Sequence, residues 1–249
     1  MEGFRDPRDG VNLGYHEMAH ALKLQDMVEN DDYNLAALGL GGMTRGISTL
    51  EMASAYGAFP NGGVYVEPIC YTKVVDADGT VLLERTANTN QAMNKGVAFI
   101  MTDILRTTVS KGIARGAAIN GQPVAGKTGT TTDNYDAWFV GFTPQYSAAL
   151  WIGNDLNVEL SQGSNAATRL WSTIMSQVCE GLPTGTYDMP DNVEKKYGEY
   201  YILDTYKTRK NPYPPPSTSS PDITGGGVTS GGGVTTDGGV TSDGGVVNP

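Results

Sequence analysis

The chain has 249 residues, a formal net charge of −10, a pI near 4.6 and a hydrophobic fraction of 39%. This length is enough for the core of one sizeable domain. The acidic balance argues against binding to nucleic acid, which needs clustered lysine and arginine. The sequence has no run of eighteen apolar residues, the length that a membrane-spanning helix needs.

The first part of the chain predicts a polar coil, a tight connection and then a helix. Residues up to about Leu24 show a weak helical pattern, and the glycine- and alanine-rich residues 35–43 are typical of a connection. Ser48 and Glu51 form a capping box, in which each side chain binds an amide that the first turn of a helix leaves free. The helix that follows ends at the Pro-Asn-Gly-Gly sequence of residues 60–63.

A hairpin and a long helix are predicted next. Residues 64–75 are rich in β-branched and aromatic side chains, residues 76–79 supply an Asp-Ala-Asp-Gly turn, and residues 80–84 return. Pro68 puts the first strand at a sheet edge or at a break. The pattern over residues 90–111 predicts a helix. Its expected buried stripe is Met93, Val97, Ile100, Met101, Ile104 and Leu105.

Three strands and a last helix complete the predicted domain. The strands cover residues 124–131, 137–143 and 146–153, and their short connections make them antiparallel neighbours. The helix covers about residues 166–180, with Ala167, Leu170, Trp171, Ile174 and Val178 as its expected buried stripe. The predicted fold class is therefore α/β of the α+β type, a mostly antiparallel sheet with helices packed on it.

Composition divides the chain into a domain over residues 1–207 and a tail over residues 208–249. The tail is rich in proline at residues 211–216, and from Gly225 it repeats a hexapeptide built on Gly-Gly-Val-Thr. So few apolar side chains among so much glycine cannot offset the entropy of ordering the chain. The composition therefore predicts a disordered tail.

Cysteine usage and the N-terminus bear on the cellular compartment. Cys70 and Cys179 are too few to define a disulfide framework. We expect both to be free and buried, with a pair between them as the alternative. The first residues lack the apolar segment of a signal peptide. Either the protein is cytoplasmic, or an export signal lies upstream of Met1.

The most informative segment is Gly-Lys-Thr-Gly-Thr-Thr at residues 126–131. Strand alternation puts Lys127 and Gly129 on one face and Thr128 and Thr130 on the other, yet either pair can reach a ligand at the rim of a cleft. Because Gly129 has no side chain, an extended peptide can approach closely and add to the strand edge. A cation beside hydroxyls suits a terminal carboxylate. The alternative is a threonine-rich edge strand with a solubilising lysine.

The sequence around these four residues resembles the transpeptidase domain of class A penicillin-binding proteins. The resemblance rests on residues 46–56 with the following Asn-Gly-Gly at 61–63, on residues 121–131, and on Asp-Ala-Trp-Phe-Val-Gly-Phe-Thr-Pro at 136–144. It covers about residues 35–183, with the motifs in the order and spacing of the family. A Lys-Thr-Gly strand is one of three signatures of the serine acyltransferases that penicillin inhibits.

The resemblance implies a peptidoglycan D,D-transpeptidase that cross-links peptide stems ending in D-Ala-D-Ala through an acyl-serine intermediate and binds β-lactams. It implies no cofactor and no metal. Lys127 and Thr128 would bind the terminal carboxylate of substrate or β-lactam, beside Gly129. The Thr130 amide would be one half of the oxyanion hole.

The other two family signatures, Ser-x-x-Lys and Ser-x-Asn, are absent from the 249 residues, because no serine from Ser48 to Ser242 fits either pattern. We therefore assign no catalytic residue and expect the chain alone to be inactive. The resemblance implies that the nucleophile, any glycosyltransferase domain and a membrane anchor lie upstream of Met1. The parent protein would then act on the extracytoplasmic face of the bacterial membrane.

Two other functions compete with this interpretation. One is a noncatalytic peptidoglycan-binding module that keeps the groove but transfers no acyl group. The other is a zinc peptidase, because His16-Glu17-Met18-Ala19-His20 matches the H-E-x-x-H pattern, in which two imidazoles bind zinc and Glu17 acts as general base. With no third histidine in the chain, the third zinc ligand would have to be acidic, with Glu29 or Glu51 as the candidates.

Overall fold

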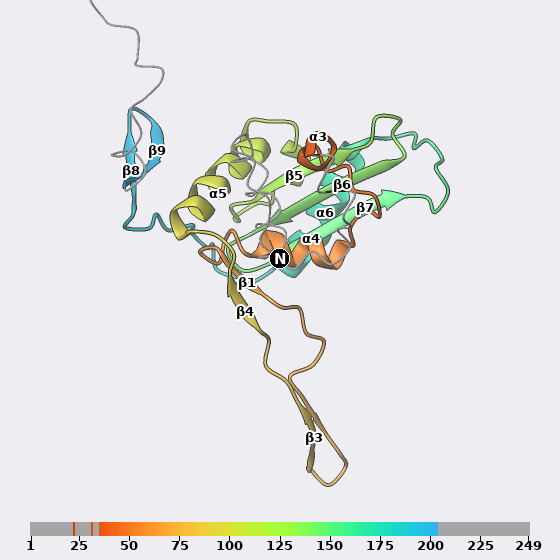
Figure 1. The fold of residues 1–249 in the computed structure, drawn as a ribbon, viewed down its shortest axis with the longest axis vertical. Helices are drawn as coiled ribbons and strands as arrows, with labels where there is room; N and C mark the ends of the chain where they lie inside the picture. The colour runs from red at the N-terminus through yellow and green to blue at the C-terminus, as the bar shows by residue number, and fades with distance from the viewer. Residues whose placement is uncertain (1–21, 23–30, 32–34, 204–249) are drawn as a thin grey trace, which may run out of the picture. The chain divides into compact units, whose positions relative to one another are not determined.

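The computed structural model describes residue 22, residue 31 and residues 35–203 (Figure 1). The tail predicted from residue 208, and most of the weak helical pattern before Leu24, lie outside the described residues. The predicted fold class is confirmed, since helices pack on antiparallel strands.

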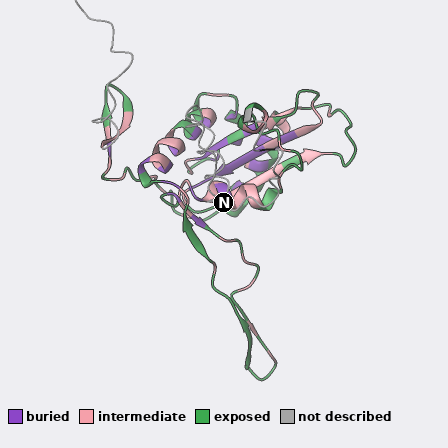
Figure 2. Cartoon of the chain, in the orientation of Figure 1, coloured by how far each residue is buried: buried purple, intermediate pink, exposed green. Residues whose placement is uncertain are grey.

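A three-stranded antiparallel sheet positions the candidate site. Its strands are β5 (Ala125–Thr130), β6 (Asp136–Phe142) and β7 (Ser147–Gly153), paired in the order β5-β6-β7. These are the three strands that the sequence predicts. The central strand β6 is the most buried of the three, as Figure 2 shows.

The strand register defines two faces of this sheet. One face, called the Trp171 face, carries every second residue of the two paired strands: Gly126, Thr128, Thr130, Ala137, Phe139 and Gly141. The other, called the Lys127 face, carries Ala125, Lys127, Gly129, Asp136, Trp138, Val140 and Phe142. Alternation of side chains along each strand produces this division.

Each face is covered by a helix, and a third helix lies beside the start of β5. Helix α6 (Ser164–Val178) covers the Trp171 face, where Trp171 meets Phe139 with ring centroids 5.0 Å apart. Helix α4 (Thr49–Gly57) lies on the Lys127 face and is joined to β7 by a 2.7 Å hydrogen bond from Ser147 Oγ to the Ala53 carbonyl. Helix α5 (Lys95–Ser110) lies against β5.

Two glycines make room for the Phe139 ring. A Cβ at Gly126 would lie 2.6 Å from Phe139 Cζ, and a Cβ at Gly141 would lie 2.6 Å from Phe139 Cε1. The ring fills this space and meets the buried Trp171 edge to face, while Trp171 Nε1 donates to the Ala148 carbonyl at 3.0 Å. The close packing of β5, β6 and α6 therefore depends on the absence of two side chains.

Helix starts follow local chemistry. The capping box at α4 is confirmed, because Ser48 Oγ accepts from the Glu51 amide and Glu51 accepts from the Ser48 amide. At α5 the cap is Asn94, whose side chain accepts from the Gly96 amide at 2.8 Å. The helix begins later than residue 90 because β4 (Thr89–Gln91) pairs with β1 (Val64–Val66).

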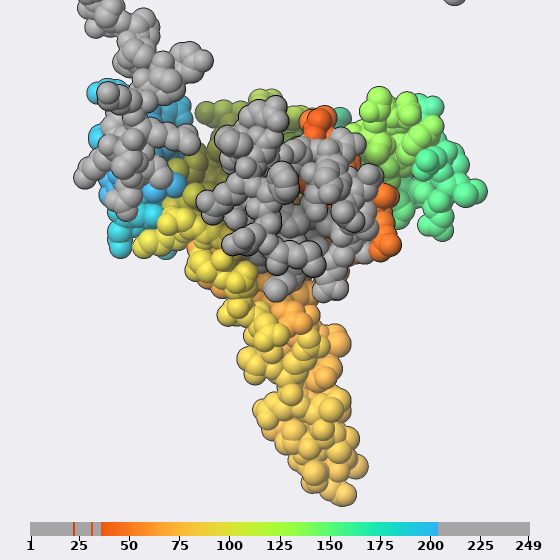
Figure 3. Space-filling model, viewed as in Figure 1, coloured from red at the N-terminus to blue at the C-terminus, as the bar shows by residue number. Residues whose placement is uncertain are grey.

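The predicted first hairpin strand is divided in two, with Pro68 in the break. Strand β2 (Lys73–Val75) pairs with β3 (Val81–Glu84), and Asp76 Oδ1 accepts from the Thr80 amide at 2.8 Å to close the turn. Figures 1 and 3 show these strands continuing outward from β1 and β4. The break that Pro68 predicts is confirmed.

Besides β4, the sequence patterns missed three regular elements and one short 3-10 helix. Residues 35–43 do not form only a connection, since α3 spans Leu35–Gly39. Strands β8 (Val193–Lys196) and β9 (Glu199–Ile202) form an antiparallel hairpin that no pattern indicated. A short 3-10 helix, η1 (Arg115–Ala117), follows α5. The β8–β9 turn puts Tyr197 and Gly198 at φ values of 53° and 90°, which glycine tolerates and tyrosine rarely adopts.

The predicted buried stripes are only partly correct. In α6, Ala167 and Trp171 are buried, but Leu170, Ile174 and Val178 are 45–46% exposed, and Thr168 and Met175 take their places. In α5, Ala98, Thr102 and Val109 are buried beside Leu105, whereas Ile104 is exposed. Small side chains let these helices approach closely, so the buried ridge is set by the partner surface rather than by apolar content.

The two cysteines are both free, as expected, but they differ in burial. Cys179, the residue that caps the C-terminal end of α6, is buried in the core, which the sequence predicted, whereas Cys70 is exposed. The expectation of burial is therefore wrong for Cys70. Cys70 follows Pro68 in the break between β1 and β2.

Gly126→Ala should destabilise the fold by about 1–3 kcal/mol, because the added methyl overpacks Phe139 and the Val140 carbonyl. Urea unfolding of the chain would measure the change. Gly57→Ala is the matched control, since its Cβ would meet only Ser147 Cβ at 3.8 Å, and helix propensity predicts a gain of about 0.5–1 kcal/mol. Equal stability of the two variants would contradict this account of the core.

Candidate functional site

The four predicted site residues lie together on β5, the outermost strand of the sheet among the described residues. Lys127 and Thr130 are exposed, Gly129 is half-buried and Thr128 is buried at 8% exposure. The predicted alternation is confirmed, since Lys127 and Gly129 occupy the Lys127 face and the two threonines occupy the Trp171 face.

The main chain of Thr128 and Thr130 faces the open edge of β5. The Gly126 carbonyl accepts a hydrogen bond from Thr108 of α5, which lies outside the sheet, so this carbonyl points away from β6. The Thr131 amide, by contrast, donates to the Asp136 carbonyl across the hairpin. Because main-chain groups alternate along an antiparallel strand, Thr128 and Thr130 point outward with Gly126.

The Lys127 ammonium lies at the same edge. Its Nζ donates to the Thr128 carbonyl at 2.8 Å, so the side chain folds along the strand instead of extending from the sheet. The edge thus combines a cation with the outward-facing main chain of Thr130. This arrangement can pair with an extended peptide and hold an anionic group beside it.

The far end of β5 is held in place by its turn. The Asp136 amide donates to Thr131 Oγ1 at 2.9 Å, and Trp151 Nε1 donates to Asp136 Oδ1 at 2.8 Å. Asn134 adopts a φ of 54° in this turn, as its short polar side chain allows, and its carbonyl accepts from the Leu160 amide at 2.9 Å. These bonds fix the position of Thr130.

The start of β5 is held by a residue that the sequence analysis did not single out. The Tyr187 hydroxyl lies 3.0 Å from the Pro123 carbonyl and 3.1 Å from the Phe142 carbonyl, so its single proton is shared between the ends of β5 and β6. Burial raises the pKa of Tyr187, and the nearby Arg106 opposes this shift. Tyr187 lies in irregular chain after α6, where periodicity gives no signal.

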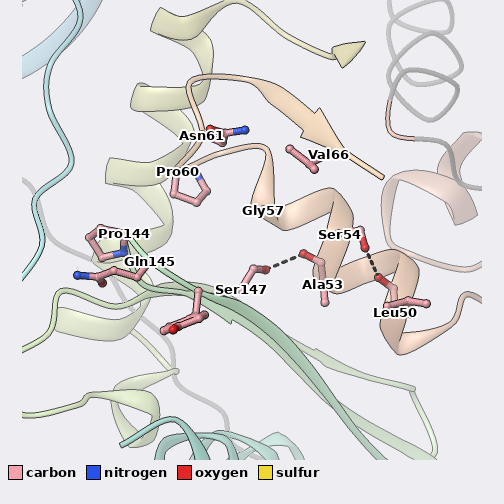
Figure 4. A pocket seen from close by; sticks show the side chains of 11 residues that line it. Leu50, Ala53, Ser54, Gly57, Pro60, Asn61, Val66, Pro144, Gln145 and Ser147 are labelled. Carbon is pink, nitrogen blue, oxygen red and sulfur yellow. Dashed lines mark hydrogen bonds between the residues drawn. The ribbon is translucent and has the colours of Figure 1, made fainter. Parts of the chain in front are cut away.

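A pocket of about 520 Å³ lies at the opposite end of the sheet (Figure 4). It is lined by Leu50 and Ser54 of α4, by Asn61 in the loop after α4, and by Tyr146 in the turn between β6 and β7. The register places this turn beside Ala125 and far from Thr130. The pocket is therefore separate from the predicted site residues.

The zinc-peptidase candidate falls mostly outside the described residues, because His16, Glu17, His20 and Glu29 are not described. Glu51 is described, and its Oε2 accepts from both the amide and the hydroxyl of Ser48. Among the described residues, no three His, Cys, Asp or Glu side chains are grouped as metal ligands would be. Within that same part of the chain, no helix has the length and hydrophobicity to span a membrane.

Comparison with protein families identifies the family to which the sheet with the β5 edge belongs. The family model for the penicillin binding protein transpeptidase domain matches residues 18–176, more than half of the chain. The chain belongs to this transpeptidase family. The match includes all of β5, β6 and β7, and so all four predicted site residues.

Curated relatives of this transpeptidase chain are bacterial penicillin-binding proteins. Penicillin-binding protein 1A of Clostridium acetobutylicum is 45% identical over 186 residues, which are 74% of this chain and 23% of the relative. Penicillin-binding protein 1A/1B of Bacillus subtilis is 38% identical over 174 residues, or 62% of this chain and 19% of the relative. The chain thus spans less than a quarter of their length.

Solved structures agree on the fold. Penicillin-binding protein 1A from Haemophilus influenzae superposes with a TM-score of 0.61 over 75% of this chain and 36% of that one, at 21% identity. PonA1 from Mycobacterium tuberculosis gives a TM-score of 0.56 at 28% identity, over 76% of this chain and 54% of that one. The likeness extends to the transpeptidase domain of a peptidoglycan glycosyltransferase from Eggerthella lenta, with a TM-score of 0.51.

Tyr187→Phe should lower the free energy of unfolding by about 1 kcal/mol at pH 8, through loss of the shared hydrogen bond. The deficit should shrink above pH 10. The unfolded phenol ionises near pH 10 while the folded one stays protonated, so the contribution of Tyr187 is intact below pH 10 and declines above it.

Urea unfolding of wild type and variant between pH 8 and pH 11 would measure this difference. Tyr146→Phe, at a side chain that is 45% exposed, is the control. A deficit for Tyr187→Phe that grows above pH 10 would show that burial does not keep this hydroxyl protonated.

Proposed function

We propose that this chain supplies the substrate-binding strand of a peptidoglycan D,D-transpeptidase that also binds β-lactams. The observation that carries the proposal is the open edge of β5, where the Lys127 ammonium lies beside the outward-facing main chain of Thr128 and Thr130. The name of the matching family, a transpeptidase domain, and the names of the relatives, penicillin-binding proteins, support the same assignment.

The donor substrate is a peptide stem that ends in D-Ala-D-Ala, and it adds to the edge of β5 as an extra strand. Gly129 leaves space for its main chain, while the Lys127 ammonium and the Thr128 hydroxyl bind the terminal carboxylate. The Thr130 amide donates to the carbonyl oxygen that becomes an oxyanion. One such donor contributes roughly 3 kcal/mol of transition-state stabilisation.

The reaction passes through an ester on a serine. That serine belongs to the Ser-x-x-Lys motif of the family, which the 249 residues do not contain. The serine oxygen attacks the D-Ala-D-Ala carbonyl carbon, the C–N bond breaks, and the last D-Ala leaves with the proton from the hydroxyl. An amine of a neighbouring stem then attacks the ester carbonyl, the C–O bond breaks, and the serine oxygen regains a proton from that amine. Splitting the transfer into two steps lowers each barrier, and the reaction occurs on the extracytoplasmic side of the membrane.

A noncatalytic peptidoglycan-binding module remains the second candidate function. The specific observation in its favour is that no serine in the 249 residues begins a Ser-x-x-Lys or Ser-x-Asn motif. Such a module would use the same edge of β5 to hold a stem peptide without forming an ester. The two candidate functions differ in one expectation. If a segment with the Ser-x-x-Lys motif is joined to this chain, the transpeptidase predicts that its serine is acylated, and the noncatalytic module predicts that it is not.

The chain by itself should not become covalently labelled by fluorescent penicillin, because its sequence has no nucleophile in the required motif. Gel fluorescence after denaturation would measure labelling, with an intact penicillin-binding protein as the positive control. A stable adduct of one label per chain, lost on substitution of one serine, would contradict the expectation and place the nucleophile within these residues.

A chimera tests the role of Lys127. In the chimera, this chain replaces the matching segment of the Clostridium acetobutylicum relative, which is aligned over 186 residues. The rest of the chimera is the sequence of that relative. Lys127→Ala should slow acylation by penicillin tenfold to a hundredfold, roughly the effect of one charge-assisted hydrogen bond of about 1.5–3 kcal/mol. Lys127→Arg keeps the charge and should lose less.

Lys73→Ala, at an exposed position of β2, is the matched control and should acylate at the wild-type rate. Acylation rate constants for Lys127→Ala within about twofold of wild type would rule out the carboxylate-binding role. No acylation of any chimera by penicillin, with the fold intact by circular dichroism, would favour the noncatalytic module.

A further inference from the structure

Two tryptophans, the half-buried Trp138 and the exposed Trp151, form a row beside the substrate-binding strand, on the Lys127 face. Trp138 lies opposite Gly129 on β5 and opposite Trp151 on β7. The two indole centroids are 6.4 Å apart with planes tilted by 41°, and Trp151 is 39% exposed. Side chains of this size normally gain stability by burial, so a pair that is only partly buried next to a binding edge indicates a surface for a ligand.

A carboxylate completes the row. Trp151 Nε1 donates to Asp136 Oδ1 at 2.8 Å, which turns the indole along the sheet towards Asp136. This orientation depends on Gly153, because a Cβ there would overlap the Trp151 ring. Among the described residues, no ion pair involves Asp136, and no hydrogen bond reaches its second carboxylate oxygen.

The row is directly connected to the edge of β5. Gly129 is the β5 residue between the open edge and Trp138, and it carries no side chain; a Cβ there would already lie 3.2 Å from Trp138 Cβ. Thr130 pairs with Ala137, the neighbour of Asp136. A group attached to a ligand at Thr130 can therefore pass over Gly129 and reach both indoles and the carboxylate.

We propose that Asp136, Trp138 and Trp151 form a binding site for a primary ammonium group. The carboxylate supplies the opposite charge, and the indole faces attract a cation through their π systems. If the proposed function holds, the ammonium belongs to the side chain of the acceptor stem. The ammonium gives one proton to the Asp136 carboxylate, and the neutral amine then attacks the carbonyl of the serine ester held at Thr130. The ester C–O bond breaks, and the serine oxygen takes the second proton from the nitrogen. This last assignment rests on the proposed function, whereas the binding of an ammonium group does not.

Titration of the isotope-labelled chain with n-butylammonium chloride tests the site. The three tryptophans give three indole N–H signals in a proton–nitrogen correlation spectrum. The Trp138 and Trp151 signals should shift saturably, whereas Trp171, which is buried and donates to the Ala148 carbonyl, should not. Sodium chloride at equal ionic strength and n-butanol serve as controls and should cause much smaller shifts.

Asp136→Asn removes the charge but keeps an oxygen that can accept from Trp151 Nε1. It should raise the Kd for n-butylammonium about threefold to fivefold, the size expected for an exposed ion pair. Asp133→Asn, at an exposed position of the same turn, is the matched control and should leave the Kd unchanged.

The proposal would be overturned if n-butanol shifted the Trp138 and Trp151 signals as much as n-butylammonium does, or if Asp136→Asn left the Kd unchanged. A parallel shift of the Trp171 signal would also contradict it, because binding would then not be confined to the row. The titration involves no acyl transfer. It therefore fails or succeeds independently of the Lys127→Ala acylation test, which addresses the proposed function itself.

Discussion

The contact between Phe139 and Trp171 is the packing interaction on which the described sheet depends. The Phe139 ring fills the space above Gly126 and Gly141, and Trp171 meets it at 5.0 Å from the helix that covers this face. One aromatic ring thereby joins β5, β6 and α6 in a single buried contact. A side chain at either glycine would push β5 away from β6 and would move the edge that carries the candidate site.

The position of β5 is also fixed at both of its ends. Tyr187 links the carbonyls of Pro123 and Phe142 at the start of the strand, and the bonds of Thr131 and Asp136 close the turn at its end. Between them, Thr108 of α5 takes the outward carbonyl of Gly126. Among the described residues, the outward main chain that this leaves for a ligand is short, because Lys127 Nζ already binds the Thr128 carbonyl; the Thr130 amide is the donor held at a fixed position.

Both faces of the sheet pack against helices, and the predicted site residues of β5 lie on both faces. The Trp171 face is apolar and covered by a helix, and its residues on β5 are a glycine and two threonines. The Lys127 face buries Phe142 against Tyr56 of α4, and it also carries Lys127, folded towards the edge, and Asp136 beside the indole pair. A stem peptide on the edge and an ammonium group on the row would therefore meet at Thr130, if both proposals hold.

Much of this protein was determined by local sequence. The Ser48 capping box, the break at Pro68, the three strands and the alternation of Lys127 with Thr128 all follow from neighbouring residues, and each is present in the structure. Local sequence patterns could not predict the features that depend on contacts between residues far apart in the chain. The buried ridges of α5 and α6, the β8–β9 hairpin and the Tyr187 anchor are set by surfaces far along the chain, because shape and close approach decide among similar apolar residues. The indole row likewise exists only through strand register, which places Gly129, Trp138 and Trp151 side by side.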